Sequence, residues 1–362
     1  MVSFDLLLVG FGNVGRQFAR LLLERSVRLR GEVGINWRVA GIATRRHGTA
    51  FDARGLDLIR ALTLAERGMP LGSLSQPDGG RTLAAEASGL DLIRHATGES
   101  RARRLQRLVV IETTLLDIER GQPAIDHVMA ALRGGADVVT ANKGPVAFAY
   151  RELNAIASVA RRHFLFEGAV MDGVPVFNLV RHTLPVADIQ GFRGVINATT
   201  NYILTAMESG RRFEQALGEM QAAGVAEADP SYDVDGWDAA AKTAAMMNVW
   251  MRASATPHTI ARTGIGAVTL EHVQDAMRRG KRIRLVAAAE RVDGVSVGRV
   301  APIEVDASDV MAGLTGLQNL LVLKTDMLGE IGIHQLDGGL NQTAYALLSD
   351  LVAIARSLGD RG

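Results

Sequence analysis

A glycine-rich turn near the amino terminus constrains the fold of this chain more than any other feature. Three glycines within Gly10–Gly15 follow an apolar stretch of strand length, Phe4–Val9. The apolar residues of Val14–Arg30 recur at helical spacing, and Trp37–Ala43 again has the length of a buried strand. Strand, glycine turn, helix and strand in this order predict a βαβ unit, and therefore a doubly wound parallel sheet.

Each glycine of this turn would have a separate role in a dinucleotide site. Gly10 permits the tight turn, Gly12 lets a pyrophosphate approach the backbone, and Gly15 lets helix and strand pack closely. Asn13 and Val14 open the helix, whose N–H groups attract an anion. The motif predicts a cofactor site at these five residues, with a purely structural glycine turn as the alternative.

The end of the second predicted strand bears on which nicotinamide cofactor binds. The acidic residue that would hold a ribose 2′-hydroxyl is missing, and Arg45 and Arg46 stand in its place. Arginines there suit a 2′-phosphate, so the sequence favours NADP over NAD. Two solvated loop arginines are the alternative interpretation.

The first domain continues as alternating strands and helices. Apolar stretches at Leu108–Ile111 and Ala136–Thr140 flank the helical stretch Ala124–Arg133, as in a parallel sheet with crossover helices. Between them and the glycine turn, the hexapeptide Gly-Leu-Asp-Leu-Ile-Arg occurs at 55–60 and again at 89–94. Two copies are too few for a repeat protein, so we expect two similar helix turns.

A second domain of α+β type is expected after the first. Lys281–Val292 and Val295–Val305 alternate around Asp293-Gly294, which is a type I′ hairpin signal. The tail Thr343–Leu358 has helical apolar spacing and is expected to pack back on the first domain. The expected divisions are a dinucleotide-binding domain at 1–150, a substrate and dimerisation domain at 151–318, and a C-terminal segment at 319–362.

The most unusual polar segment is an acidic cluster that ends in a lysine. Five carboxylates occupy twelve positions, and Lys242 follows the last of them by four residues. Asp238 and Lys242 therefore share a helix face, about 5–6 Å apart at Cβ. Lys242 is suited to move a proton to and from an alcohol or carbonyl oxygen during hydride transfer, with Asp238 orienting it. The five carboxylates are Glu227, Asp229, Asp233, Asp235 and Asp238.

The cluster also predicts what the substrate carries. Glu227 and Asp233 would hold an ammonium group, so we expect a substrate with an amine and a hydroxyl or aldehyde. A solvated acidic loop with an i,i+4 ion pair is the alternative, and such a pair contributes only about 0.3–0.5 kcal/mol. A divalent metal is a further option for clustered acids, but the adjacent Lys242 argues against it.

Two further segments place polar groups at the ends of predicted strands. Lys143 follows the strand that ends at Thr140, where open α/β sheets bind ligands, and would neutralise a substrate carboxylate or approach the nicotinamide. Asn197–Tyr202 supplies hydroxyls and amides at a strand-to-helix junction. That run would cap the helix, bind a substrate carboxylate, or both.

Composition excludes several classes of partner. Forty basic and 39 acidic residues leave a net charge of +1, which gives no reason to expect nucleic acid or an anionic membrane. The chain has no cysteine, so thiolate metal sites and a cysteine nucleophile are excluded. Without a basic leader or an apolar run of about 20 residues, we expect a cytoplasmic protein that acts on a small molecule.

With these motifs laid out, the chain resembles the homoserine dehydrogenase family over most of its length. The Glu-Ala-Asp-Pro segment followed by Asp-x-x-Gly-x-Asp-x-x-x-Lys is the most specific match, whereas the glycine motif is common to many families. The matching segments are Gly10–Gly15, Val138–Pro145, Val195–Leu204, Glu227–Lys242 and Thr343–Leu351.

The resemblance implies NAD(P)-dependent interconversion of L-homoserine and L-aspartate 4-semialdehyde in threonine and methionine biosynthesis. It also implies a Rossmann domain completed by the C-terminal segment, and a homodimer formed through the central domain. No appended feedback domain is expected. By position, Lys242 is similar to the proton-transfer lysine and Asp238 to its partner. Glu227, Asp233, Lys143 and Thr199 match substrate contacts.

The family's monovalent cation site implies a further set of ligands here. The matching positions are the Glu167 carboxylate and the backbone carbonyls of Val170, Asp172 and Val174.

The chain departs from the family pattern at several positions. Ala198 replaces a glycine, Val225 stands where an aromatic residue is common, and Met171 and Asp172 are bulkier than usual. Gly338-Gly339-Leu340 also replaces a Gly-Ala-Gly pattern. Ala198, Val225 and Met171 favour, as an alternative, a relative that oxidises another amino-bearing alcohol or amine. A catalytically silent dinucleotide-binding sensor is a second alternative, against which the retention of Asp238 and Lys242 argues.

Overall fold

The computed structural model describes residues 1–75, 83–98, 105, 107–222 and 229–359. The chain divides into two compact units. The first comprises Met1–Pro145, Ala149–Phe177 and Gly339–Gly362, and the second comprises Val146–Phe148 and Asn178–Gly338. Among the described residues, no helix combines the length and apolar composition that crossing a bilayer requires.

The first unit is built around one six-stranded sheet. Its strands lie in the order β3-β2-β1-β4-β5-β6 and are parallel except for the short edge strand β3. This is the doubly wound arrangement that the glycine turn predicts. The strands are β1 Val2–Val9, β2 Ile35–Thr44, β3 Gly48–Phe51, β4 Arg107–Glu112, β5 Asp137–Thr140 and β6 Phe164–Leu165.

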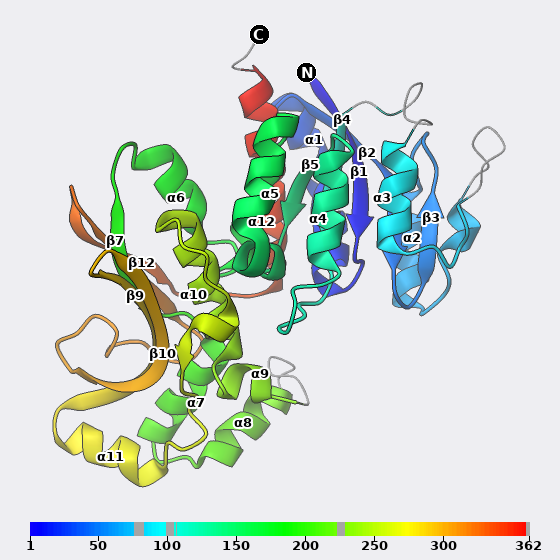
Figure 1. The fold of residues 1–362 in the computed structure, drawn as a ribbon. Helices are drawn as coiled ribbons and strands as arrows, with labels where there is room; N and C mark the ends of the chain where they lie inside the picture. Colours follow the sequence, from blue (N-terminus) through cyan, green and yellow to red (C-terminus); the bar gives the residue numbers. More distant parts are fainter. Residues whose placement is uncertain (76–82, 99–104, 106, 223–228, 360–362) are drawn as a thin grey trace. The chain divides into compact units, whose positions relative to one another are not determined.

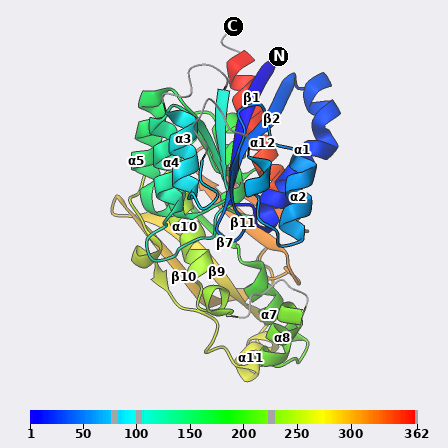
Figure 2. The same ribbon diagram turned by 90° about the vertical axis from the view of Figure 1, so that its right-hand side faces the viewer.

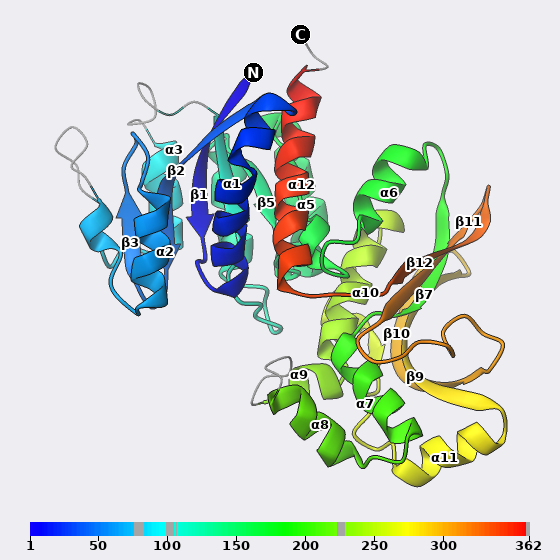
Figure 3. The same cartoon turned by 180° about the vertical axis from the view of Figure 1, so that it is seen from behind.

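Helices cover both faces of this sheet. In Figure 1, α3, α4 and α5 lie in front of the strands, and Figure 3 shows α1, α2 and α12 on the opposite face. Figure 2 shows the sheet between these two layers. The helices of this unit are α1 Asn13–Gly31, α2 Leu58–Glu66, α3 Gly89–Thr97, α4 Ala124–Arg133, α5 Gly144–Ala160 and α12 Leu340–Gly359, with short 3₁₀ turns at Gly72–Leu74 and Glu167–Ala169.

The C-terminal helix α12 completes the core of the first unit. Its apolar side packs beside α1, where Leu347 and Leu351 share a buried cluster with Leu6, Phe18 and Leu22. Strand β1 is buried on both faces, which explains its nearly continuous apolar sequence.

The second unit has its own six-stranded sheet, in the order β12-β11-β7-β9-β10-β8. The long hairpin β9–β10 pairs antiparallel, and Asp293 and Gly294 both have positive φ, as the type I′ signal predicts. The strands are β7 Ile189–Val195, β8 Ala261–Arg262, β9 Lys281–Val292, β10 Val295–Asp306, β11 Asn319–Thr325 and β12 Gly329–Gln335.

Helices pack against one face of this second sheet. Gly298 of β10 faces α10, because a Cβ placed on it would lie 2.5 Å from the Met247 sulfur. Phe192 of β7 contacts Trp250 of α10 on the same side. The helices are α7 Ala198–Glu208, α8 Phe213–Ala222, α9 Ser231–Val234, α10 Trp237–Trp250 and α11 Leu270–Arg278, with a 3₁₀ turn at Pro257–Thr259; α6 Val176–Thr183 crosses the division between the units.

The divisions fall at other residues than the sequence suggests. Strand β6 adds to the parallel sheet, so 149–177 belongs to the first unit. The hairpin β11–β12 pairs with β7, so 319–338 belongs to the second unit, and only the chain from Gly339 returns to the first. Strand pairing over long sequence separations sets these divisions, and local periodicity carries no record of it.

Candidate active site

The glycine turn after β1 has the geometry of a dinucleotide site. Gly10 has φ of +93°, and a Cβ there would lie 2.6 Å from the Thr113 carbonyl carbon. A Cβ on Gly15 would lie 2.5 Å from the Gly10 oxygen, so helix and strand close up at that point. At Gly12 no atom comes within 4 Å of the added Cβ. The turn is therefore tight at its first and third glycines and open at its second, as an approaching pyrophosphate requires.

The amino end of α1 is suited to an anion. The helix starts at Asn13 after Gly12, its first turn holds no acidic residue, and no side chain caps it. Asn13 accepts a hydrogen bond of 2.9 Å from the Arg16 guanidinium, which places a cation beside the same helix end. A partial positive charge from the aligned peptides adds to this environment. These residues fit the phosphates of a dinucleotide.

The carboxyl ends of the parallel strands align at one edge of the sheet. Val9 is level with Ala43 of β2 and Glu112 of β4, and Glu112 is level with Thr140 of β5. The turn of Arg45 and Arg46 follows β2 at this edge, and both arginines are exposed. Gly10 is joined to the end of β2 by a hydrogen bond from its N–H to the Ala43 carbonyl.

Lys143 follows β5 at the same edge and is supported by a residue that sequence reasoning missed. Asn142 donates from its side chain to the Thr114 carbonyl at 3.0 Å and accepts from the Gly144 N–H at 2.8 Å. Its own N–H donates to the Thr140 hydroxyl, which in turn donates to the buried carboxylate of Glu112. The sequence analysis also missed Glu112; the signal that could have found it is an acidic residue at the end of an apolar strand.

The second unit brings the predicted proton-transfer pair together. The Lys242 ammonium lies 2.8 Å from an Asp238 carboxylate oxygen and donates to the Ile196 carbonyl at 2.7 Å. The Lys242 side chain is 15% exposed and that of Asp238 12%, so this is a largely buried ion pair at which a substrate can still arrive. The i,i+4 spacing brought the pair together, but the carbonyl that holds the lysine comes from the end of β7.

Asp233 joins this pair through an amide. The Asn197 side chain donates 2.7 Å to Asp233 and 3.0 Å to Asp238. Burial and the negative charge of Asp238 raise the pKa of Asp233 above its usual value, while hydrogen bonds from Asn197 and Thr199 and the charge of Lys242 oppose that rise. The structure thus brings together four predicted residues, Asp233, Asp238, Lys242 and Thr199, with Asn197 as the connecting group. We call this group the carboxylate–lysine site.

The start of α10 is held by its local sequence and by two contacts to its first residue. Gly236 has φ of +80° and starts α10, a helix whose alanines and methionines are buried almost all round. Asp238 lies in its first turn, where a negative charge is favourable. The Arg262 guanidinium stacks 3.7 Å from the Trp237 ring, and His258 contacts the same ring edge to face. These contacts fix the helix end from which Asp238 and Lys242 project.

Not every predicted residue enters this cluster. Glu227 and Val225 lie outside the described residues. Lys143 belongs to the first unit. Asp229 accepts from the Ser231 N–H as a local turn contact, and Asp235 is exposed, so neither takes part in the carboxylate–lysine site.

The segment matched to a cation site is a tight turn in the first unit. Glu167 is 2% exposed, and its carboxylate accepts from the Phe177 N–H at 2.8 Å. Met171 and Asp172 both have positive φ, and the Asp172 carboxylate accepts from the Gly339 N–H and the Thr343 hydroxyl. Two departures from the family pattern, Asp172 and Gly339, therefore meet at the start of α12. Within the described residues, no cluster of three acidic or histidine side chains forms a metal site.

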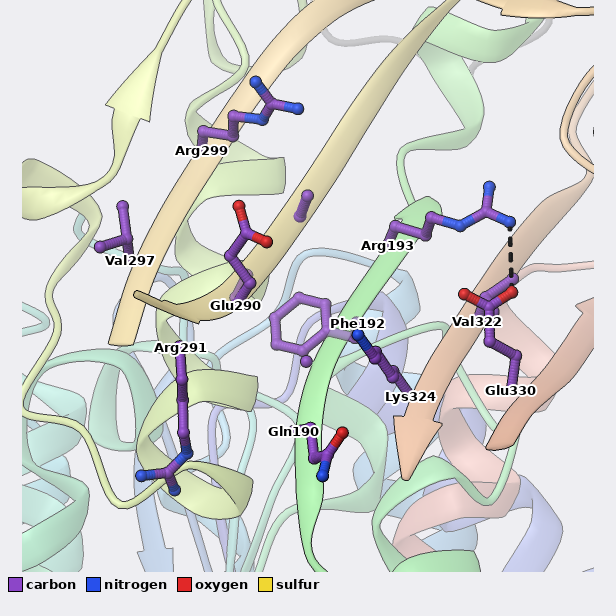
Figure 4. A pocket seen from close by; sticks show the side chains of 13 residues that line it. Gln190, Phe192, Arg193, Glu290, Arg291, Val297, Arg299, Val322, Lys324 and Glu330 are labelled. Carbon is purple, nitrogen blue, oxygen red and sulfur yellow. Dashed lines mark hydrogen bonds and ion pairs between the residues drawn. The ribbon is translucent and has the colours of Figure 1, made fainter. Parts of the chain in front are cut away.

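A separate hollow lies on the face of the second sheet that points away from α10. It has charged side chains of both signs around a small-residue floor that includes Gly191 and Ala288, and Arg193 pairs with Glu330 at 3.5 Å (Figure 4). Its charged residues are Arg193, Glu290, Arg291, Arg299, Lys324 and Glu330. This surface is distinct from the carboxylate–lysine site.

Comparison with known proteins identifies what this chain is similar to. Residues 175–352 match the homoserine dehydrogenase family model. The chain is 33% identical over 358 residues to an NAD(+)-dependent homoserine dehydrogenase of Pseudomonas canavaninivorans, covering 99% of this chain and 97% of that protein. It is 34% identical to the homoserine dehydrogenase of Methanocaldococcus jannaschii, covering 98% and 99%.

Solved structures give the same result. A crystal structure from Archaeoglobus fulgidus, provisionally described as a homoserine dehydrogenase, superposes with a TM-score of 0.82 at 30% identity, covering 98% of this chain and 99% of that one. The homoserine dehydrogenase of Thiobacillus denitrificans superposes with a TM-score of 0.77 at 29% identity, covering 98% and 74%.

Proposed function

This chain belongs to the homoserine dehydrogenase family of NAD(P)-dependent oxidoreductases, and we propose that it interconverts L-homoserine and L-aspartate 4-semialdehyde at Lys242. The observation that carries this proposal is the largely buried ammonium of Lys242, held between the Asp238 carboxylate and the Ile196 carbonyl. Such a group is suited to protonate an oxygen that gains charge as a hydride is added. The reaction would serve threonine and methionine biosynthesis in the cytoplasm.

The proposed chemistry is a proton transfer coupled to a hydride transfer. A nicotinamide bound at the glycine turn would supply the hydride to the aldehyde carbon in reduction and would accept it from the alcohol carbon in oxidation. Lys242 gives a proton to the carbonyl oxygen in the first direction and takes the hydroxyl proton in the second. Asp238 keeps the ammonium oriented, since its oxygen lies 2.8 Å from Nζ.

The remaining polar groups suit the two ends of an amino acid. Asp233, beside Asn197 and Thr199, would bind the substrate ammonium, and Glu227 would add a second carboxylate. Lys143 would neutralise the substrate carboxylate or approach the nicotinamide. A cationic amine in the substrate would balance an acidic site that holds Asp233 and Asp238 against one lysine.

For the cofactor, we infer binding at Gly10, Gly12, Asn13, Val14 and Gly15, with a preference for NADP. The open space at Gly12 and the uncapped start of α1 support the site. The exposed pair Arg45 and Arg46 at the end of β2 supports NADP, because guanidinium groups there can pair with a 2′-phosphate. The NAD(+)-dependent relative at 33% identity is a reason to test both cofactors.

We also propose a monovalent cation at the turn after β6. The Glu167 carboxylate and the carbonyls of Val170, Asp172 and Val174 are hard oxygen donors of the type that such ions prefer. The two consecutive positive-φ residues at 171 and 172 support this proposal, because they redirect successive carbonyls of the turn. Potassium or sodium would then raise activity in the wild type, and Glu167→Gln would abolish that dependence.

We further propose a homodimer formed through the face of the second sheet that points away from α10. Four basic and two acidic side chains line the hollow of Figure 4, so a basic group of one copy can face an acidic group of its two-fold copy. Arg299 on β10 and Lys324 on β11 lie on this face. The double change Arg299→Glu with Lys324→Glu would convert a dimer into a monomer in light scattering of the size-separated protein.

One assay tests the reaction. The purified chain with L-homoserine and NADP or NAD should form reduced nicotinamide, and Lys242→Ala should form it about 10²- to 10⁴-fold more slowly. If other amino alcohols are oxidised while homoserine is not, the substrate proposal fails. Ala198, the first residue of α7, follows Asn197 directly and is one of the departures that would favour such an outcome.

A further inference from the structure

One amide holds the carboxylates of the second unit in place. The Asn197 nitrogen donates to Asp233 at 2.7 Å and to Asp238 at 3.0 Å, and both bonds reach across long sequence separations. The residue before it, Ile196, accepts from Lys242 through its carbonyl. The side chain of Asn197 is buried, with 4% of the residue exposed. A single dipeptide therefore contacts Asp233, Asp238 and Lys242.

The orientation of this amide is fixed by its other end. Asn197 caps α7, because its side-chain oxygen accepts from the Thr200 N–H and the Thr200 hydroxyl, both at 2.9 Å. A backbone N–H can only donate, so the oxygen must face Thr200 and the two N–H groups must face the carboxylates. Helix capping and carboxylate binding are therefore two functions of one side chain.

The charges of the site explain why such a donor is needed. Asp233 faces Asp238 and Lys242 from α10, and Asn197 and Thr199 from the junction of β7 and α7. Two carboxylates share one ammonium, and the Asp238 oxygen that meets Asn197 is the one that meets Lys242. Without a donor between them, repulsion would favour a proton on Asp233 and would free Asp238 to turn away from the lysine.

We propose that Asn197 is a positioning residue for the reaction: it turns the Asp238 carboxylate toward Lys242 and lets Asp233 ionise to receive the substrate ammonium. This inference rests on the proposed function and extends it to the ionisation of the substrate site. Asn197 acts through the two aspartates, so its removal should change how activity depends on pH as well as how large it is.

Asn197→Ser separates the two functions of this residue. Serine keeps a side-chain oxygen that caps a helix but lacks the two N–H donors. We expect kcat/KM for L-homoserine to fall roughly 10- to 100-fold, the loss expected for hydrogen bonds to charged groups. We also expect the acidic limb of the kcat/KM profile to move to higher pH. Asn197→Asp keeps the cap and adds a third carboxylate, so the acidic limb of its kcat/KM profile should move to still higher pH.

Asn201→Ser is the matched control. Asn201 is a buried amide of the same helix, and its side-chain nitrogen donates to the carbonyls of Gly316 and Gln318. Its loss should lower the melting temperature without moving the pH profile. If Asn197→Ser keeps the wild-type kcat/KM and profile, or if Asn201→Ser moves the profile equally, the proposal is overturned.

A second measurement needs no substrate and so separates this proposal from the reaction itself. In Asn197→Ser the free energy of unfolding should fall more steeply with pH, above the unfolded-state pKa of Asp233, than in the wild type, because Asp233 would hold its proton more tightly in the folded state. Adding Asp233→Asn should remove the difference. Equal slopes would overturn the inference, whereas a wild type without homoserine activity would overturn only the proposed function.

Discussion

The dinucleotide turn and the carboxylate–lysine site are built in opposite ways. The turn consists of consecutive residues, and its shape depends on backbone angles and on missing side chains at Gly10, Gly12 and Gly15. The carboxylate–lysine site consists of side chains from the end of β7, from α9 and from α10, joined by hydrogen bonds. The first is specified by neighbours in sequence and the second by neighbours in space.

This difference predicts how each region fails. A backbone turn fails by steric clash, and one added methyl group is enough where the space is closed. A side-chain cluster fails by loss of a charge or a donor, and the fold around it can survive. Substitutions in the turn should therefore affect folding and cofactor affinity, whereas substitutions in the cluster should affect turnover and its pH dependence.

The largest effect on turnover is expected for Lys242→Ala. Loss of a positioned acid–base group costs about 10²- to 10⁴-fold in rate, so kcat should fall by that factor while NADP still binds. Lys281→Ala is the control, because Lys281 lies on β9 as a partly exposed lysine 3.8 Å from Glu304. A Lys242→Ala enzyme that retains more than a tenth of wild-type kcat would show that another group transfers the proton.

Gly10→Ala should abolish cofactor binding. Alanine is strained at φ of +93°, and its Cβ would meet the Thr113 carbonyl carbon at 2.6 Å. Gly12→Ala is the paired variant, since its φ is −76° and no atom lies within 4 Å of the new Cβ. Its melting temperature should match the wild type, and only its affinity for the dinucleotide, measured by fluorescence titration, should fall. Equal losses of stability would contradict the open geometry at Gly12.

Asp233→Asn should separate stability from activity. The pKa of Asp233 is raised in the folded state, so the protonated side chain favours folding; this contribution is fully present below the unfolded pKa and is lost as pH rises through the folded pKa. Replacing Asp233 with a neutral amide should leave the free energy of unfolding at pH 7 equal or higher, and should flatten the fall of that free energy as pH rises above the unfolded pKa. KM for homoserine should rise, because the ammonium loses a carboxylate. A destabilised variant at pH 7 would count against a raised pKa.

The smallest effect is expected for Arg45→Ala with Arg46→Ala. Both residues are exposed, so their contacts to a phosphate are screened by solvent. KM for NADP should rise about tenfold, as for loss of roughly 1.4 kcal/mol, while KM for NAD stays nearly constant. Parallel changes for the two cofactors would show that these arginines do not read the 2′-phosphate. Raising the salt concentration should also weaken the preference of the wild type for NADP over NAD.

A repeated hexapeptide shows the limit of local sequence. Gly-Leu-Asp-Leu-Ile-Arg was expected to give two similar helix turns, and helices do follow at both copies. In the first, Gly55 has φ of +109° and Asp57 caps α2. In the second, the helix already starts at Gly89, because Ser88 before it supplies the cap and Asp91 completes a capping box. One flanking residue shifts the same six residues into different positions of a helix.

The sequence by itself determined many of the elements and the pairs whose partners lie within one turn of chain. Periodicity predicted the central strands β1, β2, β4 and β5, the hairpin at Asp293-Gly294 and the helix α12, and i,i+4 spacing predicted the contact of Asp238 with Lys242. The strands β11 and β12 were not predicted. These features depend on local backbone geometry, which the order of residues specifies directly.

Only the tertiary structure decided how the site is held together. Asn197 meets Asp233 and Asp238 across 36 and 41 residues, and Ile196 meets Lys242 across 46. Asn142 and Glu112 support Lys143 through strands whose register follows from sheet pairing. Such contacts depend on how α7 and α10 pack on one sheet, and packing is a property of the whole core that no segment encodes alone.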